Sequence, residues 1–247
     1  MSDTVTALVS DIRAAFAARA NTEVAVHQQA YMKSSLPYYG LKTPETRAAL
    51  KPLLVQHTLK SFAEWELAIR TLWDTVTYRE EWYAAIGIAR YGRYREYRTS
   101  LDALPLYEHM IRTGAWWDVC DEIARQLAGE VLMAHRKEAS AIMRSWSTDD
   151  HMWIRRCSIL SQGKHKHKTD ASLLRDCILP SLDDTDFFSR KAIGWALRDY
   201  AQVDPEWVRA FVGEFEDRLS GLSKREALRH LPQVADQPGS ADALQRE

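Results

Sequence analysis

Apolar residues recur every three or four positions along most of the chain, as at Ile12, Ala15, Phe16 and Ala20. This is the period of a helix that buries one face, and no alternating stretch of convincing length indicates a strand. The pattern therefore predicts an all-α protein with short connections. We expect helices at residues 4–20, 24–33, 45–57, 61–73, 78–92, 101–113, 116–133, 135–146, 150–162, 171–180, 186–203, 205–217 and 223–231.

The expected helices form pairs that repeat about every 35–40 residues, which is the spacing of a HEAT-like α-solenoid of stacked antiparallel helix pairs. Because no repeated sequence signature accompanies this spacing, a single irregular helical domain is the alternative. A solenoid curves and has a concave face, which suits a long partner. We expect one domain over residues 1–232 and a polar, flexible tail over residues 233–247.

Composition narrows the class of protein. Hydrophobic residues make up 46% of the 247 residues and charged residues 27%, as in soluble globular proteins. No apolar run approaches the ~20 residues of a membrane span, and the N-terminus lacks the apolar region of a signal peptide. The three cysteines, Cys120, Cys157 and Cys177, fit buried free thiols in a reducing compartment. We therefore expect a bacterial cytoplasmic protein that makes no membrane contact.

Two adjacent tryptophans and two aspartates give the most informative stretch of the chain. Trp117 and Asp121 are four residues apart and share one helix face, on the shoulder of the apolar stripe that includes Trp116. Asp118 falls on the solvent side. An aromatic ring beside a carboxylate can receive a positive charge. The alternative is that Trp117 is peripheral core and that Asp121 pairs with Arg125.

Two other helices carry residues that their own cores do not explain. Trp195 is expected to point about 150° away from the apolar stripe of its helix, between Lys191 and Arg198. That position suits stacking on a nucleic acid, with packing against a neighbouring helix as the alternative. Arg156 lies at the edge of an apolar stripe, where a charge needs a carboxylate or phosphate partner. An internal ion pair is the alternative for Arg156.

Basic tracts suggest contacts with phosphate groups, although the net charge is only −1. Lys164, Lys166 and Lys168 alternate with histidines in an expected loop, and Arg190 adds a charge near Trp195. Residues 90–98 interleave arginines with tyrosines. Solvated loops and exposed charged helices are the alternatives. The lysines disfavour a metal site at the histidines, and the phosphate-binding glycine loop, zinc spacing and Gly-x-Ser-x-Gly motif are all missing from the sequence.

Five segments together resemble the AlkD-type DNA alkylation-repair glycosylases, a family of HEAT-like helical proteins. The likeness runs in order through roughly residues 25–232. The segments are 31–47 (YMKSSLPYYGLKTPETR), 116–121 (WWDVCD), 153–156 (WIRR), 191–200 (KAIGWALRDY) and 222–227 (LSKREA).

By this resemblance the catalytic aspartate of the family corresponds to Asp121, its two groove tryptophans to Trp117 and Trp195, and its groove arginine to Arg156. Cys120, where the family is usually aliphatic, changes only a core position. The candidate DNA contacts are Lys42, Thr43, Arg47, Lys164, Lys166, Lys168, Arg190, Lys191 and Arg198.

The resemblance implies hydrolysis of the N-glycosidic bond of N3- or N7-alkylated purines in double-stranded DNA, by a monomer that does not flip the lesion. It implies neither a metal nor a nucleotide cofactor. Arg156 would hold a phosphate or orient Asp121. The alternatives are a non-catalytic HEAT-like scaffold that binds protein or DNA, and a relative that binds DNA but has lost activity.

Overall fold

The computed structural model describes residues 3–231, so the tail expected over residues 233–247 lies outside the described residues. Within residues 3–231 every regular element is helical and no strand occurs, which confirms the predicted fold class. The α-helices are α1 (Asp3–Ala17), α2 (Thr22–Met32), α3 (Thr43–Gln56), α4 (Phe62–Asp74), α5 (Arg79–Arg90), α6 (Arg95–Arg98), α7 (Leu104–Gly114), α8 (Trp117–Ile123), α9 (Gly129–Ala134), α10 (Arg136–Ser147), α11 (Met152–Leu160), α12 (Ala171–Ile178), α13 (Phe187–Ala201), α14 (Pro205–Glu214) and α15 (Gly221–Leu228).

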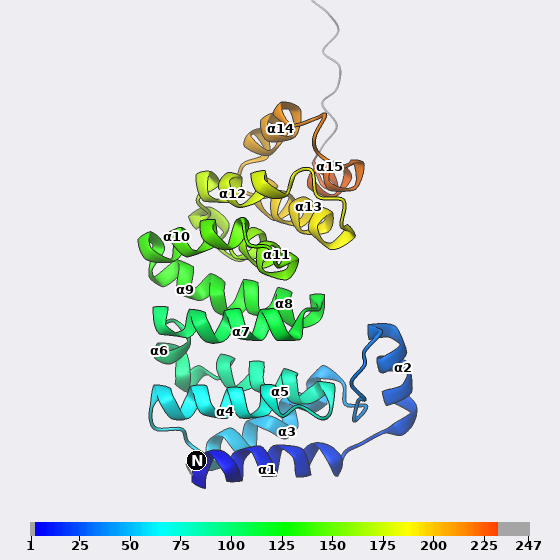
Figure 1. The fold of residues 1–247 in the computed structure, drawn as a ribbon, viewed down its shortest axis with the longest axis vertical. Helices are drawn as coiled ribbons and strands as arrows, with labels where there is room; N and C mark the ends of the chain where they lie inside the picture. The colour runs from blue at the N-terminus through cyan, green and yellow to red at the C-terminus, as the bar shows by residue number, and fades with distance from the viewer. Residues whose placement is uncertain (1–2, 232–247) are drawn as a thin grey trace, which may run out of the picture.

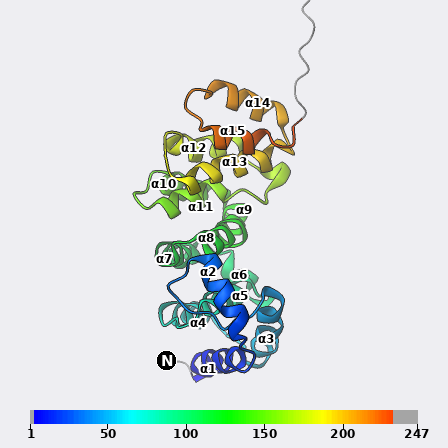
Figure 2. The ribbon, with the colours of Figure 1, turned by 90° about the vertical axis from the view of Figure 1, so that its right-hand side faces the viewer.

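The helices stack in layers to form a helical solenoid, from α1 at one end to α14 and α15 at the other (Figures 1 and 2). In Figure 1, α2 and the α13–α15 end extend farther to one side than α7 and α8 do, so the stack is concave there. Apolar stripes from every layer join in one buried cluster that reaches from Val5 to Ala227. None of the helices within residues 3–231 combines the length and apolar character that crossing a membrane requires.

The helix expected over residues 116–133 is interrupted. Trp116 is the N-cap, α8 ends at Ile123, and a π-helical turn, η3 (Ala124–Ala128), connects it to α9. Just after this turn the backbone of Gly129 approaches α11 so closely that a Cβ atom there would lie 2.4 Å from the Ser161 carbonyl oxygen. The local change of helical period therefore accompanies close packing against the neighbouring layer.

Residues 33–42 connect α2 to α3 without regular structure and are held by a buried carboxylate. Glu80 of α5 accepts hydrogen bonds from the backbone N–H groups of Tyr39, Gly40 and Leu41, at 3.0, 2.9 and 3.1 Å. Burial raises the pKa of Glu80, and these hydrogen bonds oppose that shift. The connection is therefore fixed against α5, next to the site described below.

Candidate active site

A carboxylate and a guanidinium from neighbouring layers form the centre of the site. Arg156 of α11 donates from Nε to Oδ1 of Asp121 and from Nη2 to Oδ2, both at 2.7 Å. Its Nη1 donates to the backbone oxygen of Phe188. The Arg156 side chain is 1% exposed and that of Asp121 is 16% exposed. The ion pair therefore has its positive end buried and its negative end toward solvent.

This pair decides between the alternatives for both residues. Arg156 is fully buried rather than at the edge of its stripe, and its partner is an internal carboxylate. A phosphate-binding role for Arg156 is incompatible with this burial. Asp121 does not pair with Arg125, which contacts Asp199 instead. Asp121 pairs with Arg156 instead because α11 packs between α8 and α13 and so places Arg156 against Asp121.

Aromatic rings surround the buried guanidinium. Its Cζ atom lies 5.5 Å from the ring centre of Trp195 and 5.9 Å from the ring centres of both Trp153 and Phe188. Such distances allow cation–π attraction. Trp195 is half-buried and packs against the main core, so it does not stand opposite the core as the helix-wheel argument predicted. Its neighbour α11 supplies the contact that a single-helix projection omits.

Lys191 and Arg198 flank Trp195 as predicted, at 5.9 and 5.8 Å from its ring centre. Both cations are also paired within the protein. Lys191 Nζ lies 2.8 Å from Oε1 of Glu226 and Arg198 Nη1 lies 2.5 Å from Oε2. The Lys191 hydrogen bond lowers the pKa of Glu226. Since two cations share one carboxylate, a net positive charge remains beside Trp195.

At the start of α8 the sequence prediction was partly wrong. Asp118 does not face solvent: Arg79 donates to it from Nε and Nη2 at 3.1 and 2.6 Å, and the Tyr83 hydroxyl donates at 2.6 Å. The cause is α5, which packs across the first turn of α8. Trp116 is half-buried against Trp153 and Phe188 rather than central core. Trp117 is half-buried as expected and contacts the small cluster of Ala25, Met32 and Tyr38.

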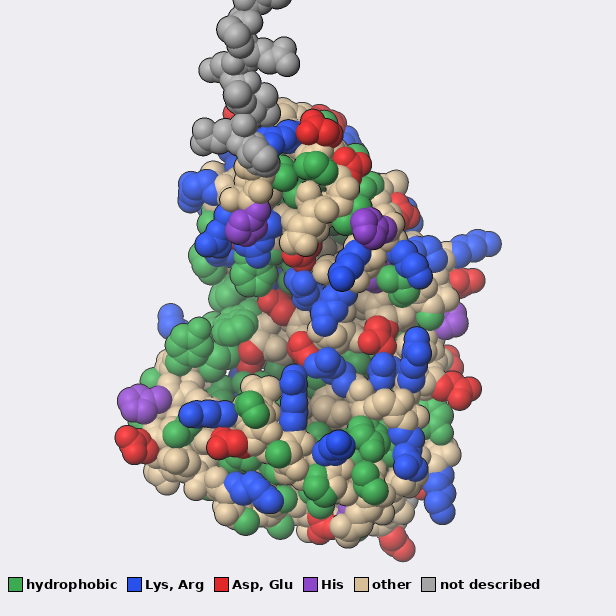
Figure 3. All heavy atoms as spheres, turned by 180° about the vertical axis from the view of Figure 1, so that it is seen from behind, with side chains coloured by type: hydrophobic (Ala, Val, Ile, Leu, Met, Phe, Trp, Pro, Cys, Tyr) green, Lys and Arg blue, Asp and Glu red, His purple; other side chains and the backbone are tan. Residues whose placement is uncertain are grey.

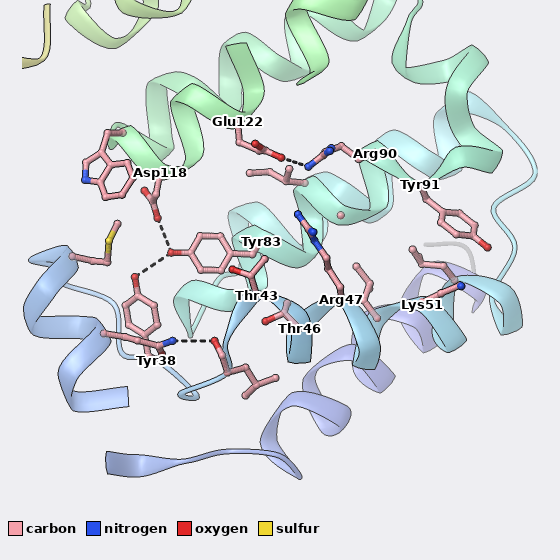
Figure 4. A pocket seen from close by; sticks show the side chains of 18 of the residues that line it. Tyr38, Thr43, Thr46, Arg47, Lys51, Tyr83, Arg90, Tyr91, Asp118 and Glu122 are labelled. Carbon is pink, nitrogen blue, oxygen red and sulfur yellow. Dashed lines mark hydrogen bonds and ion pairs between the residues drawn. The ribbon is translucent and has the colours of Figure 1, made fainter. Parts of the chain in front are cut away.

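A cavity of about 790 Å³ opens between α2, α3, α5 and α8, with Trp117 and Asp118 in its wall. Figure 4 shows the Arg47 side chain directed from α3 toward Arg90 and Glu122, which form an ion pair. Thr43 and Arg47, two of the candidate DNA contacts, line this cavity, and Lys42 caps α3 nearby. Burial raises the pKa of Tyr38 to about 12, so its hydroxyl stays protonated where it meets Tyr83.

A second cavity of about 500 Å³ lies between η3, the loop after α11 and helix α13, and Arg125, Lys164 and Lys166 are among its lining residues. The expected loop at residues 164–168 contains a short 3-10 turn, η4 (Lys166–Lys168), and its three lysines are exposed. His165 is buried, and burial lowers its pKa to about 4. Its Nε2 lies 2.9 Å from the Gly129 carbonyl oxygen.

The remaining basic residues differ in their exposure and in whether they are paired within the protein. Arg190 donates from Nε to the backbone oxygen of Asp184 at 3.0 Å and is half-buried. In the tract at residues 90–98, Arg90 and Arg98 are paired with glutamates of the next layer, whereas Arg93 and Arg95 are exposed. Figure 3 shows Lys and Arg side chains spread over the face seen from behind, with Asp and Glu side chains between them. Charges of both signs are therefore mixed on this face, in keeping with the net charge of −1.

The structure thus brings Asp121, Arg156 and Trp195 into one cluster and leaves Trp117 one turn from Asp121 on α8. Lys42, Thr43 and Arg47 lie by the first cavity, and Lys164 and Lys166 by the second. Sequence reasoning missed Phe188 and the partners in neighbouring layers, since nothing in the local pattern marks them. Trp153 could have been found, because it stands three residues before Arg156 on one helix.

Comparisons with known proteins identify the family of the chain. The family model for DNA alkylation repair enzymes matches residues 12–231. A solved structure, the "predicted DNA alkylation repair enzyme from Enterococcus faecalis", is 30% identical, with a TM-score of 0.79 over 87% of this chain and 98% of that chain. No curated protein matches the chain. Because the family model covers most of its length, the chain belongs to the family of DNA alkylation repair enzymes.

Proposed function

We propose that this protein is a hydrolytic DNA glycosylase that removes positively charged N3- and N7-alkylated purines, such as 3-methyladenine and 7-methylguanine, from double-stranded DNA. One observation carries the proposal. Asp121 is 16% exposed and is held through both oxygens by a buried Arg156, whose guanidinium lies 5.5 Å from the ring centre of Trp195. This is a fixed dipole with its negative end toward solvent, which suits a positive charge that develops outside it.

Hydrolysis of the glycosidic bond of an alkylated purine requires few groups besides this carboxylate. An alkylated purine already carries a formal positive charge, so it can leave with the electrons of the glycosidic bond without first receiving a proton. The deoxyribose then becomes cationic, and the Asp121 carboxylate stabilises that charge. Water adds to the sugar at C1′ and loses a proton, which completes hydrolysis. No cofactor is needed, because the positive charge already makes the alkylated base a good leaving group.

The two tryptophans contribute attraction and position. The faces of Trp117 and Trp195 are electron-rich and would pack against the sugar as it becomes cationic. Arg156 acts as a positioning residue, because its buried guanidinium holds both carboxylate oxygens of Asp121 and is itself fixed by the Phe188 carbonyl. The lesion would stay stacked in the duplex rather than enter a base pocket.

The concave side of a HEAT-like stack, acting as one domain and as a monomer, would hold the duplex. Exposed cations on both sides of Asp121 support this arrangement, because phosphate contacts flank a lesion in both directions along the strand. Thr43 and the cations Lys42, Arg47, Lys164, Lys166, Lys168 and Arg190 would contact the backbone. Lys191 and Arg198 share Glu226 and would contribute less charge each.

Release of 7-methylguanine from methylated duplex DNA tests the proposal directly. We expect the purified wild-type protein to release the free base and to leave abasic sites in the DNA. A protein that binds the duplex but releases no base would favour the non-catalytic scaffold. Unmethylated duplex of the same sequence serves as the control, because uncharged purines lack the activated leaving group.

A further inference from the structure

A second ion pair lies one helical turn from the catalytic one. Nη1 of Arg125 lies 2.9 Å from Oδ2 of Asp199, and Nη2 of Arg125 donates to the Gly163 carbonyl oxygen at 3.1 Å. The side chains are 28% and 24% exposed, and both residues line the second cavity. Arg125, in η3, therefore contacts two other parts of the chain: the turn that follows α11 and helix α13.

Each residue of this pair stands about one helical turn after a residue of the cluster of Asp121, Arg156 and Trp195. Arg125 stands four residues after Asp121, and Asp199 stands four residues after Trp195, so each shares a helix face with its predecessor. Helix α11 lies between α8 and α13 (Figure 1). The Arg125–Asp199 contact therefore spans the layer of α11 and joins η3, which directly follows the helix that carries Asp121, to the helix that carries Trp195.

The surroundings of Arg125 are built to hold its side chain. It lies in the π-helical turn η3, and such turns are frequent at functional sites. A Cβ atom at position 163 would lie 3.0 Å from its Cζ atom and 3.2 Å from Nε and Nη1, so glycine leaves the space that the guanidinium occupies. The ion pair and this close approach are independent observations, and both fix Arg125 at the junction.

We propose that Arg125 is a positioning residue that sets the placement of Asp121 relative to Trp195 by clamping η3 to α13. The inference rests on the proposed glycosylase function. If the two helices were free to shift, the carboxylate and the indole would no longer face the same sugar. Misplacement of reacting groups by about 1 Å can lower a rate by about 10²-fold.

The test compares Arg125→Gln with Arg144→Gln. Arg144 also joins two helices through an ion pair, with Asp176, but it lines neither cavity. We expect Arg125→Gln to lower the single-turnover excision rate constant by about 10- to 100-fold, with duplex affinity within a factor of about three of wild type. Arg144→Gln should change neither. An Arg125→Gln variant that excises at the wild-type rate, or that loses only affinity, would overturn the proposal.

Two further variants keep the test decisive. Gly163→Ala crowds the guanidinium without removing its charge and should lower the rate in the same direction. The double variant Arg125→Gln/Asp199→Asn should excise no more slowly than Arg125→Gln alone, because the two residues act as a unit. A double variant whose loss of rate is the product of the two single losses would contradict the proposal.

A readout independent of activity separates this inference from the proposed function. The indole N–H signal of Trp195 in a nuclear magnetic resonance spectrum, identified with Trp195→Phe, should shift or broaden in Arg125→Gln and not in Arg144→Gln. A wild-type protein without excision activity would reject the glycosylase, whereas an unmoved Trp195 signal would reject the clamp.

Discussion

Replacement of Asp121 by asparagine removes the charge that the proposed mechanism needs, and it also removes the partner of a buried cation. The Arg156 side chain is 1% exposed, so in this variant a buried guanidinium would have no carboxylate beside it. Breaking a buried ion pair in this way costs about 3–5 kcal/mol. For a domain of this size, each kcal/mol lowers the melting temperature by roughly 2–4 °C. We therefore expect Asp121→Asn to melt roughly 10 °C below wild type.

The loss of activity should exceed what the loss of stability explains. At a temperature where Asp121→Asn is still folded, excision should fall by about 10²-fold or more, which is the scale of removing one electrostatic stabiliser. Affinity for duplex DNA should be retained, because a carboxylate makes no favourable contact with phosphate. The assay is single-turnover release of 7-methylguanine at saturating enzyme, with equilibrium binding measured on the same duplex.

Asp118→Asn is the matched control. Asp118 lies on the same helix, three residues earlier, and its partner Arg79 is also nearly buried, at 6% exposure of the side chain. This variant should lose a similar amount of stability and keep most of its excision rate. Wild-type excision by Asp121→Asn would refute the assigned role. Equal losses of excision rate in the two variants would show that activity follows structure at the start of α8 rather than the Asp121 charge.

Three further predictions concern charge, pH and backbone. Replacing Lys164 and Lys166 by alanine should lower the slope of log affinity against log salt concentration by about two, as titration of DNA binding will measure; an unchanged slope would remove both from the interface. Unfolded histidine binds a proton below about pH 6.5, whereas His165 stays neutral until about pH 4. Acidification between these values should therefore cost about 3 kcal/mol of wild-type stability, and urea unfolding should show a smaller loss in His165→Gln. Gly40→Ala should lower the free energy of unfolding by on the order of 3 kcal/mol, because φ is +89° and a Cβ atom would lie 2.0 Å from the Asn21 carbonyl oxygen; a stable variant would show that residues 33–42 can rearrange.

The periodicity of apolar residues predicted the helices and their order, because each helix buries one face whatever its neighbours are. It did not predict the π-helical turn after Ile123, which accompanies the close approach of Gly129 to Ser161 in another layer. The projection of a single helix likewise placed Trp195 opposite the apolar stripe, because it omits the contacts that neighbouring layers make with Trp195. Contacts between layers decide such features, and a single helix contains no information about them.

The partners of the charged residues follow a rule that the sequence does contain. In a solenoid each repeat contacts its neighbours, so paired charges should stand about one repeat apart. Asp121 and Arg156 are separated by 35 positions, as are Lys191 and Glu226. The same interval recurs away from the site, at 32 positions for Arg144–Asp176, 39 for Arg175–Glu214 and 35 for Arg218–Asp183. The repeat is thus recorded in charge spacing even though no repeated apolar signature is present.

Ion pairs between residues about one repeat apart in sequence are therefore ordinary in this fold. Such spacing cannot by itself mark a catalytic residue. What distinguishes Asp121–Arg156 is the asymmetry of its burial and the aromatic rings around it. The Arg125–Asp199 pair does not follow the rule of one-repeat spacing. Its two residues are separated by about twice the repeat, and the pair spans the layer of α11. A contact that joins next-nearest layers resists relative motion of the helices on either side of α11. The proposed mechanism requires that resistance, because in it Asp121 and Trp195 act on the same sugar.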